Sequence, residues 1–173
     1  LVLTQNIPGG EVVKEKTVMA IVVSAGEQVT YMPDIEGLEK DAVVDLLVNM
    51  GWTQEDITIE DKESDVAPGY VAELAVADGK TIACGDEIAV GTKMVIYIST
   101  GRKDYDSQKQ TTVPDVCNKS WGDAMQTLAS SKLYIYKLAT EYSDTVPKGH
   151  IISQNPTAKE TTTEGEKVGV VVS

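Results

Sequence analysis

Hydrophobic residues recur at intervals of three and four in two separate segments of the chain. The later segment covers residues 121–131, and Ser120 precedes it, with Asp123 three residues further on. That pairing is typical of a capped helix start. The spacing of the apolar residues places them on one face, so we predict a helix over 121–131. The apolar residues of this face are Trp121, Ala124, Met125 and Leu128.

A second helix is predicted along the apolar stripe from Ala42 to Met50, and Gly51 follows it, as glycine often does where a helix ends. The start of this helix is less well specified. When the two copies are aligned, this segment has one residue fewer before Ala42 than the later copy has before its helix. It also has no Ser or Thr in the capping position, so we expect Gly37 or Glu36 to cap the helix. The apolar stripe consists of Ala42, Val43, Leu46, Leu47 and Met50.

Segments rich in β-branched and aromatic residues predict strands after the later helix. They cover 133–138, 150–154 and 167–172, and a turn containing Asp, Pro and Gly lies at 143–149. Gly165 precedes the last strand, and we expect it to take a positive φ angle. Each unit is therefore predicted to contain an opening strand, a helix and three strands.

The chain also repeats itself. The segments "VLTQNIPGGEVVKEKTVMAIVVS", ending at Ser24, and "IISQNPTAKETTTEGEKVGVVVS", ending at Ser173, align without a gap, and a looser copy ends at Ser99. Such a repeat predicts an elongated array of small α+β modules, each with one helix packed on a three-stranded sheet. We place the modules at 1–26 (the second half of a truncated copy), 27–101 and 102–173.

The connections between the modules differ. The linker at 101–114 is longer than the one at 26–33, and we expect a bend or a hinge there. Leu1 falls inside a repeat, so we expect the sequence to be a piece of a longer chain. The hairpin at 1–26 lacks the helix of its module, and its apolar face needs upstream residues, the next module or another molecule to cover it. Without a cover, proteolysis is expected to trim the chain near Glu27.

Composition and charge exclude several classes of partner. The net charge is −12, and Arg102 is the single arginine. Nucleic-acid binding requires clustered Lys and Arg side chains against the phosphates, so we expect no nucleic-acid partner. The same negative charge opposes docking on an anionic membrane surface. A neutral or zwitterionic partner is favoured.

Little in the sequence supports catalysis or metal binding. His150 is the only histidine and shares no motif with a Ser or Cys nucleophile. The acidic residues lack the spacing of a calcium loop, and two cysteines are too few for a zinc site. We expect no enzyme activity, metal or cofactor in this chain. Cys84 and Cys117 are expected to be small buried side chains, with an inter-module disulfide as the alternative.

The motifs of the last module together resemble the PASTA domain family, the small extracellular modules of penicillin-binding proteins and bacterial Ser/Thr kinases. The resemblance covers nearly the whole chain. The middle copy departs from it at "AELAVADGK", where the family usually has a Gln and a Pro. The resemblance implies a helix on a three-stranded sheet. Its motifs are "VPDV" at 113–116, Ala124, Leu128, "PKG" at 147–149, Gln154, Pro156 and the closing "VGVVVS".

The resemblance also implies a function, namely recognition of peptidoglycan fragments (muropeptides) or of β-lactams, which mimic their D-alanyl end. In the kinases, one membrane helix joins a cytoplasmic catalytic domain to an extracellular row of three or more modules, whereas penicillin-binding proteins often have two. Parts of three modules are present here, which favours the extracellular region of a membrane-anchored Ser/Thr kinase. The alternatives are the C-terminal region of a penicillin-binding transpeptidase and a spacer or dimerisation stalk that binds no ligand.

Four residues are candidates for ligand contact: Arg102, Tyr134, Gln154 and Asn155. A guanidinium binds a carboxylate, such as those of a muropeptide, through two parallel hydrogen bonds, although Arg102 is also explained as an exposed linker charge. Tyr134 offers a flat face for a sugar ring. Gln154 and Asn155 are suited either to bond a peptide stem or to fix their own hairpin. Other aromatic candidates are Tyr136 and Trp52, the latter expected in the core.

Overall fold

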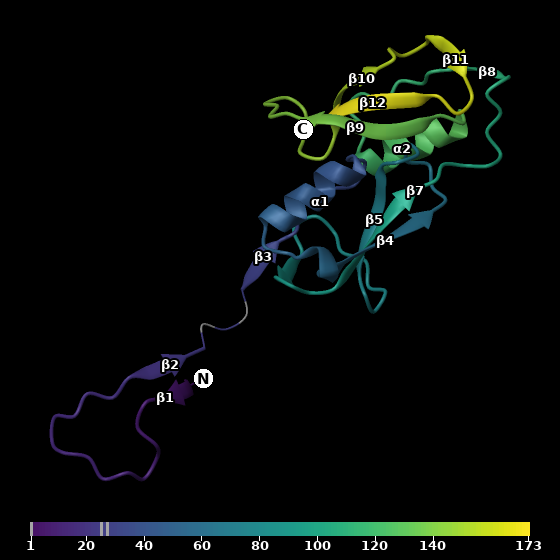
Figure 1. The fold of residues 1–173 in the computed structure, drawn as a ribbon. Coiled ribbons are helices and arrows are strands. Elements are labelled where there is room, and N and C mark those ends of the chain that lie inside the picture. Colours follow the sequence, from purple (N-terminus) through teal and green to yellow (C-terminus); the bar gives the residue numbers. More distant parts are fainter. Residues whose placement is uncertain (1, 25, 27) are drawn as a thin grey trace.

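A computed structural model describes residues 2–24, 26 and 28–173. The predicted boundaries at Leu1 and Glu27, and the expected cleavage near Glu27, lie outside the described residues. Three parts follow one another along an elongated chain: an N-terminal hairpin (2–24), a middle module (28–101) and a last module (102–173) (Figure 1). The predicted α+β fold of tandem small modules is confirmed. The boundaries between the modules stay a prediction.

The last module packs one helix, α2, on a three-stranded sheet with the order β10-β12-β9 (Figure 1). The central strand β12 pairs parallel with β9 and antiparallel with β10. The opening strand β8 pairs with β11 in a separate two-stranded sheet. The elements are β8 (Gln110–Thr112), α2 (Trp121–Ser130), β9 (Tyr134–Thr140), β10 (Ile151–Asn155), β11 (Thr161–Thr163) and β12 (Lys167–Val172).

The middle module has the same plan, with helix α1 and the sheet order β4-β7-β5. Here β7 pairs parallel with β4 and antiparallel with β5, and β3 pairs with β6 as β8 does with β11. The elements are β3 (Val29–Tyr31), α1 (Lys40–Asn49), the 3₁₀ turn η1 (Gln54–Asp56), β4 (Ile57–Lys62), β5 (Val71–Val76), β6 (Glu87–Ala89) and β7 (Met94–Ser99).

The two helices start differently, and the start of α1 corrects the expectation from the sequence. Ser120 caps α2 as predicted, its hydroxyl accepting the Asp123 N–H at 3.2 Å. The residue that precedes α1 is Glu39, not Gly37 or Glu36, and its side chain makes no capping bond. Glu39 therefore occupies the place of Ser120, and no residue is missing. Accordingly Val43 and Leu47 are the buried residues of α1, whereas Ala42 is exposed.

Each module has its own hydrophobic cluster, made mainly of aliphatic side chains. Trp52 is buried in the middle one, as expected, and its indole N–H donates to the carbonyl oxygen of Thr92 at 3.0 Å. The predicted positive φ of Gly165 is confirmed at 83°. One member of the last module's cluster, Val66, comes from the middle module.

The N-terminal hairpin consists of β1 (Val2–Gln5) and β2 (Ile21–Val23), which pair antiparallel and lie apart from the modules in Figure 1. Apart from Ile7, which is partly buried, its large apolar side chains are at least half exposed, from 50% at Ile21 to 97% at Val12. The face that was expected to need a cover is therefore open to solvent. Within the described part of the chain, no helix is long and apolar enough to cross a membrane.

Candidate functional site

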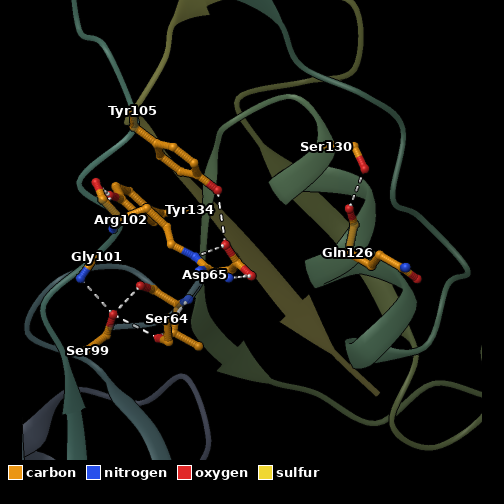
Figure 2. A network of polar contacts seen from close by, with 10 residues as sticks. Ser64, Asp65, Ser99, Gly101, Arg102, Tyr105, Gln126, Ser130 and Tyr134 are labelled. Atoms are coloured by element: carbon orange, nitrogen blue, oxygen red, sulfur yellow. Dashed lines mark hydrogen bonds and ion pairs between the residues drawn. The ribbon is translucent and has the colours of Figure 1, made fainter. Parts of the chain in front are cut away.

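The candidate site lies where the middle and last modules meet, around an ion pair between Arg102 and Asp65 (Figure 2). The guanidinium contacts the carboxylate at two points, with Nε at 2.8 Å from Oδ1 and Nη2 at 3.0 Å from Oδ2. Tyr105 donates a further hydrogen bond to Oδ1 at 3.1 Å. The hydrogen bond from Arg102 lowers the pKa of Asp65, and Tyr105 acts in the same direction against partial burial.

The turn that presents Asp65 is held by serine hydroxyls. Ser99 Oγ accepts from Ser64 Oγ at 2.9 Å and donates to the carbonyl oxygen of Val66 at 2.6 Å. The Gly101 N–H donates back to Ser99 Oγ at 3.0 Å (Figure 2). The end of β7 and the start of the linker are therefore both hydrogen-bonded to the turn that contains Asp65. These bonds hold Asp65 close to Arg102, the second residue of the linker.

Tyr134 ties the linker to the last module. Its hydroxyl accepts the Arg102 N–H at 2.6 Å and donates to the Arg102 carbonyl oxygen at 3.1 Å. Gly101 has φ +76°, and a Cβ there would lie 2.6 Å from the Tyr134 hydroxyl oxygen. A glycine is required for this close approach. The linker is thus longer than its counterpart, as the sequence shows, but its first residues are bound at both ends rather than free to act as a hinge.

A cavity of about 500 Å³ lies beside the ion pair and has a mixed lining. Its apolar wall includes Val66, Val71, Leu74 and Ile82, and Met125 of α2 closes one side. The polar lining has more negative than positive groups, since only Lys62 and Arg102 are cationic. The volume is within the range of small-molecule sites. The carboxylates are Asp34, Glu36, Glu63, Asp65 and Glu73.

Glu36 differs from Asp65 and Glu73 in the direction of its pKa shift. Burial raises its pKa, and the nearby Trp121 indole and Lys137 ammonium lower it by less. The Trp121 N–H is buried and faces Glu36 without reaching hydrogen-bond geometry. Glu73, in contrast, is paired with Lys62, whose hydrogen bond lowers the pKa of Glu73. The cavity therefore has a paired carboxylate at Glu73 and a half-buried one at Glu36.

The four candidate residues from the sequence divide between two places. Arg102 and Tyr134 meet at the joint, but Tyr134 is buried and offers no open face to a sugar ring. Gln154 instead bonds its own module: its Oε1 accepts the Val116 N–H at 2.8 Å, and its Nε2 donates to the Pro114 carbonyl at 3.0 Å. Asn155 follows it, and neither lines the cavity. Their role in ligand contact stays a prediction.

The sequence did not single out Asp65 or Tyr105. Asp65 lies in the "SD" turn that occurs in both modules, and its counterpart Asp144 is exposed. The only sequence signal was the single arginine in the following linker. Such an arginine suggests an acidic partner, but the sequence does not identify which carboxylate it is. Pairing of this kind depends on how the two modules pack, which periodicity does not report.

The cysteines and the acidic residues contribute no further site. Cys84 and Cys117 are both free, and Cys84 is exposed rather than buried as expected. Burial raises the pKa of the Cys117 thiol, helped by Asp115. Among the residues that the structure describes, no group of three or more His, Cys, Asp or Glu side chains is arranged to hold a metal ion.

The chain is similar to one known domain family and to several bacterial kinases. The sequence profile of the PASTA domain matches residues 111–173. A probable serine/threonine-protein kinase of Clostridium perfringens is 28% identical over 142 residues, which are 82% of this chain and 18% of that protein. The serine/threonine-protein kinase PknB of Mycobacterium leprae is 26% identical over 82% of this chain and 20% of its own length. The chain thus spans about a fifth of these relatives.

A solved structure is similar over almost the whole chain. The entire extracellular region of the Ser/Thr kinase PrkC from Staphylococcus aureus is 28% identical, with a TM-score of 0.46, and the match covers 99% of this chain and 56% of that one. Penicillin-binding protein 2X from Streptococcus thermophilus is more distant, at 12% identity and a TM-score of 0.26 over 84% of this chain and 17% of its own.

Proposed function

Because residues 111–173 are a PASTA domain, we propose that the chain is part of the extracellular region of a membrane-anchored bacterial Ser/Thr kinase and that it binds peptidoglycan fragments. The kinase relatives support this parentage, since they match over most of this chain and a fifth of their own length. PASTA modules carry no catalytic machinery, so the kinase activity would belong to the rest of such a protein.

The observation that carries the ligand proposal is the position of Arg102 at the edge of the joint cavity. Its side chain is 41% exposed, and the two bonds to Asp65 use Nε and Nη2. Nη1 and the second N–H of Nη2 are the donors left for a ligand carboxylate. A guanidinium holds carboxylates with directional, charge-assisted hydrogen bonds. A fragment of a peptidoglycan stem peptide, or a β-lactam, supplies such a carboxylate.

The charge of the cavity favours a zwitterionic ligand. Lys62 pairs with Glu73, Arg102 with Asp65 and Lys137 with Asp34, so the carboxylates of Glu36 and Glu63 are left in the lining without a cationic partner among the described residues. A stem peptide carries an amino group as well as a carboxylate, so its ammonium end fits the acidic side while its carboxylate lies at Arg102. One such site gives little affinity, and several modules along a polymer gain from avidity.

Titration with synthetic muropeptides tests the proposal. We expect NMR shift changes at Arg102, Asp65 and Glu36 at millimolar ligand, and we expect Arg102→Gln to weaken binding. Lys103→Gln is the matched control, because it removes one exposed positive charge from the same linker. No perturbation at millimolar ligand, or equal loss from both substitutions, would overturn the proposal that Arg102 recognises the ligand.

A second candidate function is a spacer or stalk, which three observations favour. Arg102 is already satisfied by Asp65, Tyr134 holds its backbone, and the exposed apolar hairpin offers a surface for self-association. A stalk predicts no response to muropeptides and a concentration-dependent mass in analytical ultracentrifugation. A ligand response in a monomer at all concentrations would exclude it.

A further inference from the structure

The middle module supplies part of the last module's sheet. The segment Asp65–Ala67 lies along the outer edge of β9: the Ile135 N–H donates to the Asp65 carbonyl oxygen at 3.2 Å, and the Ala67 N–H donates to the Ile135 carbonyl oxygen at 2.8 Å. Val66 forms a parallel bridge with Ile135. An edge strand that would otherwise expose unpaired amide and carbonyl groups is therefore covered.

Val66 also fills the last module's core. Its side chain is only 1% exposed and belongs to the cluster that contains Leu128, Ile135 and Val170. Tyr70 and Ala72, again from the middle module, pack against the same cluster, and the rings of Tyr70 and Tyr136 lie 4.9 Å apart. The last module is thus incomplete without residues that precede its linker.

An ion pair between a buried lysine and a partly exposed aspartate crosses the same joint. Lys137 of β9 has a side chain that is 1% exposed, and its Nζ lies 2.8 Å from Asp34 Oδ2 of the middle module. Nζ also lies 5.0 Å from the centre of the Trp121 ring, and the Lys137 N–H donates to the Gly37 carbonyl oxygen at 2.8 Å. A buried ammonium is costly without a partner, so this side chain requires Asp34.

The internal repeat provides a comparison within the molecule. The turn around Val66 has a close counterpart at Thr145, since the Val66 N–H donates to Ser64 Oγ at 3.2 Å as the Thr145 N–H donates to Ser143 Oγ at 3.3 Å. Thr145, which corresponds to Val66, is exposed, and Asp115, which corresponds to Asp34, makes no ion pair with another described residue. The turn therefore forms without a module packed against it, and the packing at Val66 is an additional property of this joint.

We propose that the middle and last modules form one cooperative folding unit with a fixed angle between them. In this unit the Asp65–Ala67 segment completes the β9 edge, Val66 completes the core, and Asp34 neutralises Lys137. A force or rotation applied to one module is then transmitted to the other, and no hinge acts between them.

Amide hydrogen exchange on the full chain tests the proposal. Val66→Ala and Asp34→Asn are changes in the middle module, yet we expect each to speed exchange of the slowest amides of β9 and β12 by roughly 5- to 30-fold, as a loss of one or two kcal/mol does. Thr145→Ala and Asp115→Asn are the matched controls, and we expect changes of less than about twofold from these surface substitutions.

A third variant separates a lost interaction from simple misfolding. In Asp34→Asn combined with Lys137→Met, the buried charge is removed together with its partner, so we expect protection in β9 and β12 to recover toward the parent level. The proposal is overturned if Val66→Ala and Asp34→Asn speed exchange only within β4, β5 and β7, or if the controls have equal effects. It is also overturned if the double variant is no better than Asp34→Asn alone.

Discussion

The ring of Trp121 occupies the space that a side chain at residue 37 would need. Gly37 has φ +76°, and a Cβ built on it would lie 2.3 Å from Cη2 of Trp121. The absence of a Cβ allows the loop of the middle module to reach the start of α2. The Gly37 carbonyl oxygen then accepts the Lys137 N–H, so the close approach of Gly37 and Trp121 is part of the joint itself.

Gly37→Ala should therefore weaken the joint. The left-handed backbone alone costs about 1–2 kcal/mol for a residue with a Cβ, and displacement of the Trp121 ring adds to this. Chemical denaturation measures the loss. Gly69→Ala is the control, because Gly69 has φ +89° and nothing within 4 Å of the new Cβ. Equal losses from the two substitutions would show that the contact with Trp121 contributes nothing.

Much of the fold could be predicted from the sequence, because the elements follow local patterns. The helix at 121–131, its Ser120 cap and the strand at 167–172 depend on periodicity and capping chemistry, and α2 and β12 match them. The cap of α1 was misplaced, because Glu39 precedes the helix and not Gly37 or Glu36. Ala42, Val43 and Val44 are consecutive apolar residues, so the pattern alone does not identify Val43 as the buried one.

The joint could not be predicted in the same way. Its contacts join residues far apart in sequence, such as Asp34 with Lys137 and Asp65 with Arg102. In a chain with many acidic residues, each of these side chains has several possible partners of opposite charge. Which pair forms depends on how the two folded modules pack. The exposed counterparts of Asp34 and Asp65 in the last module show that the same local sequence occurs with and without a partner.

Glu36 should make the joint more stable in mild acid than at neutral pH. Burial raises the pKa of Glu36 above the ordinary value of 4.5. The Trp121 indole and the Lys137 ammonium lower this pKa, whereas the negative charges of Asp34 and Glu73 raise it further. A carboxyl with a raised pKa binds its proton more tightly in the folded protein, so its ionised form weakens folding above that pKa. The penalty disappears as the pH falls through the raised pKa.

Glu36→Gln should consequently stabilise the protein at pH 7 and flatten its stability between pH 7 and the ordinary carboxyl range. Thermal unfolding across this pH range is the measurement. Glu55→Gln removes an exposed carboxylate from the same module and serves as the control. A Glu36→Gln protein that is less stable than the parent at pH 7 would contradict the assignment of Glu36 as a buried, unfavourable charge.

Asp65 should have the opposite pH dependence. The Arg102 hydrogen bond lowers its pKa, so it contributes stability above its ordinary pKa of about 4, and this contribution is lost as the pH falls through the lowered value. Because the pair is partly exposed, Asp65→Asn should cost no more than about 1 kcal/mol at pH 7. Asp144→Asn, at the exposed counterpart, should cost nothing measurable, and the difference should shrink below about pH 4.

The two helix starts predict opposite effects of substitution. Ser120→Ala removes a hydroxyl that accepts the Asp123 N–H, and it should destabilise the last module by about 1 kcal/mol. Glu39 makes no capping bond, so Glu39→Ser should stabilise the middle module by about 0.5–1 kcal/mol. Denaturant midpoints measure both. Stabilisation by Ser120→Ala, or no gain from Glu39→Ser, would show that tertiary contacts outweigh the caps.

The N-terminal hairpin should be the first part of the chain to be cut by proteases. Most of its apolar side chains are exposed, with Val12 at 97%, and the described interactions across it are the pairing of β1 with β2 and the hydrogen bonds between Asn6 and Ala20. A two-stranded hairpin of this kind is marginally stable in water. Limited proteolysis of a dilute monomer, followed by mass spectrometry, should therefore release fragments from 2–24 before any cut in 28–173. Survival of the hairpin intact while the modules are cut would show that another surface of the protein covers its apolar face.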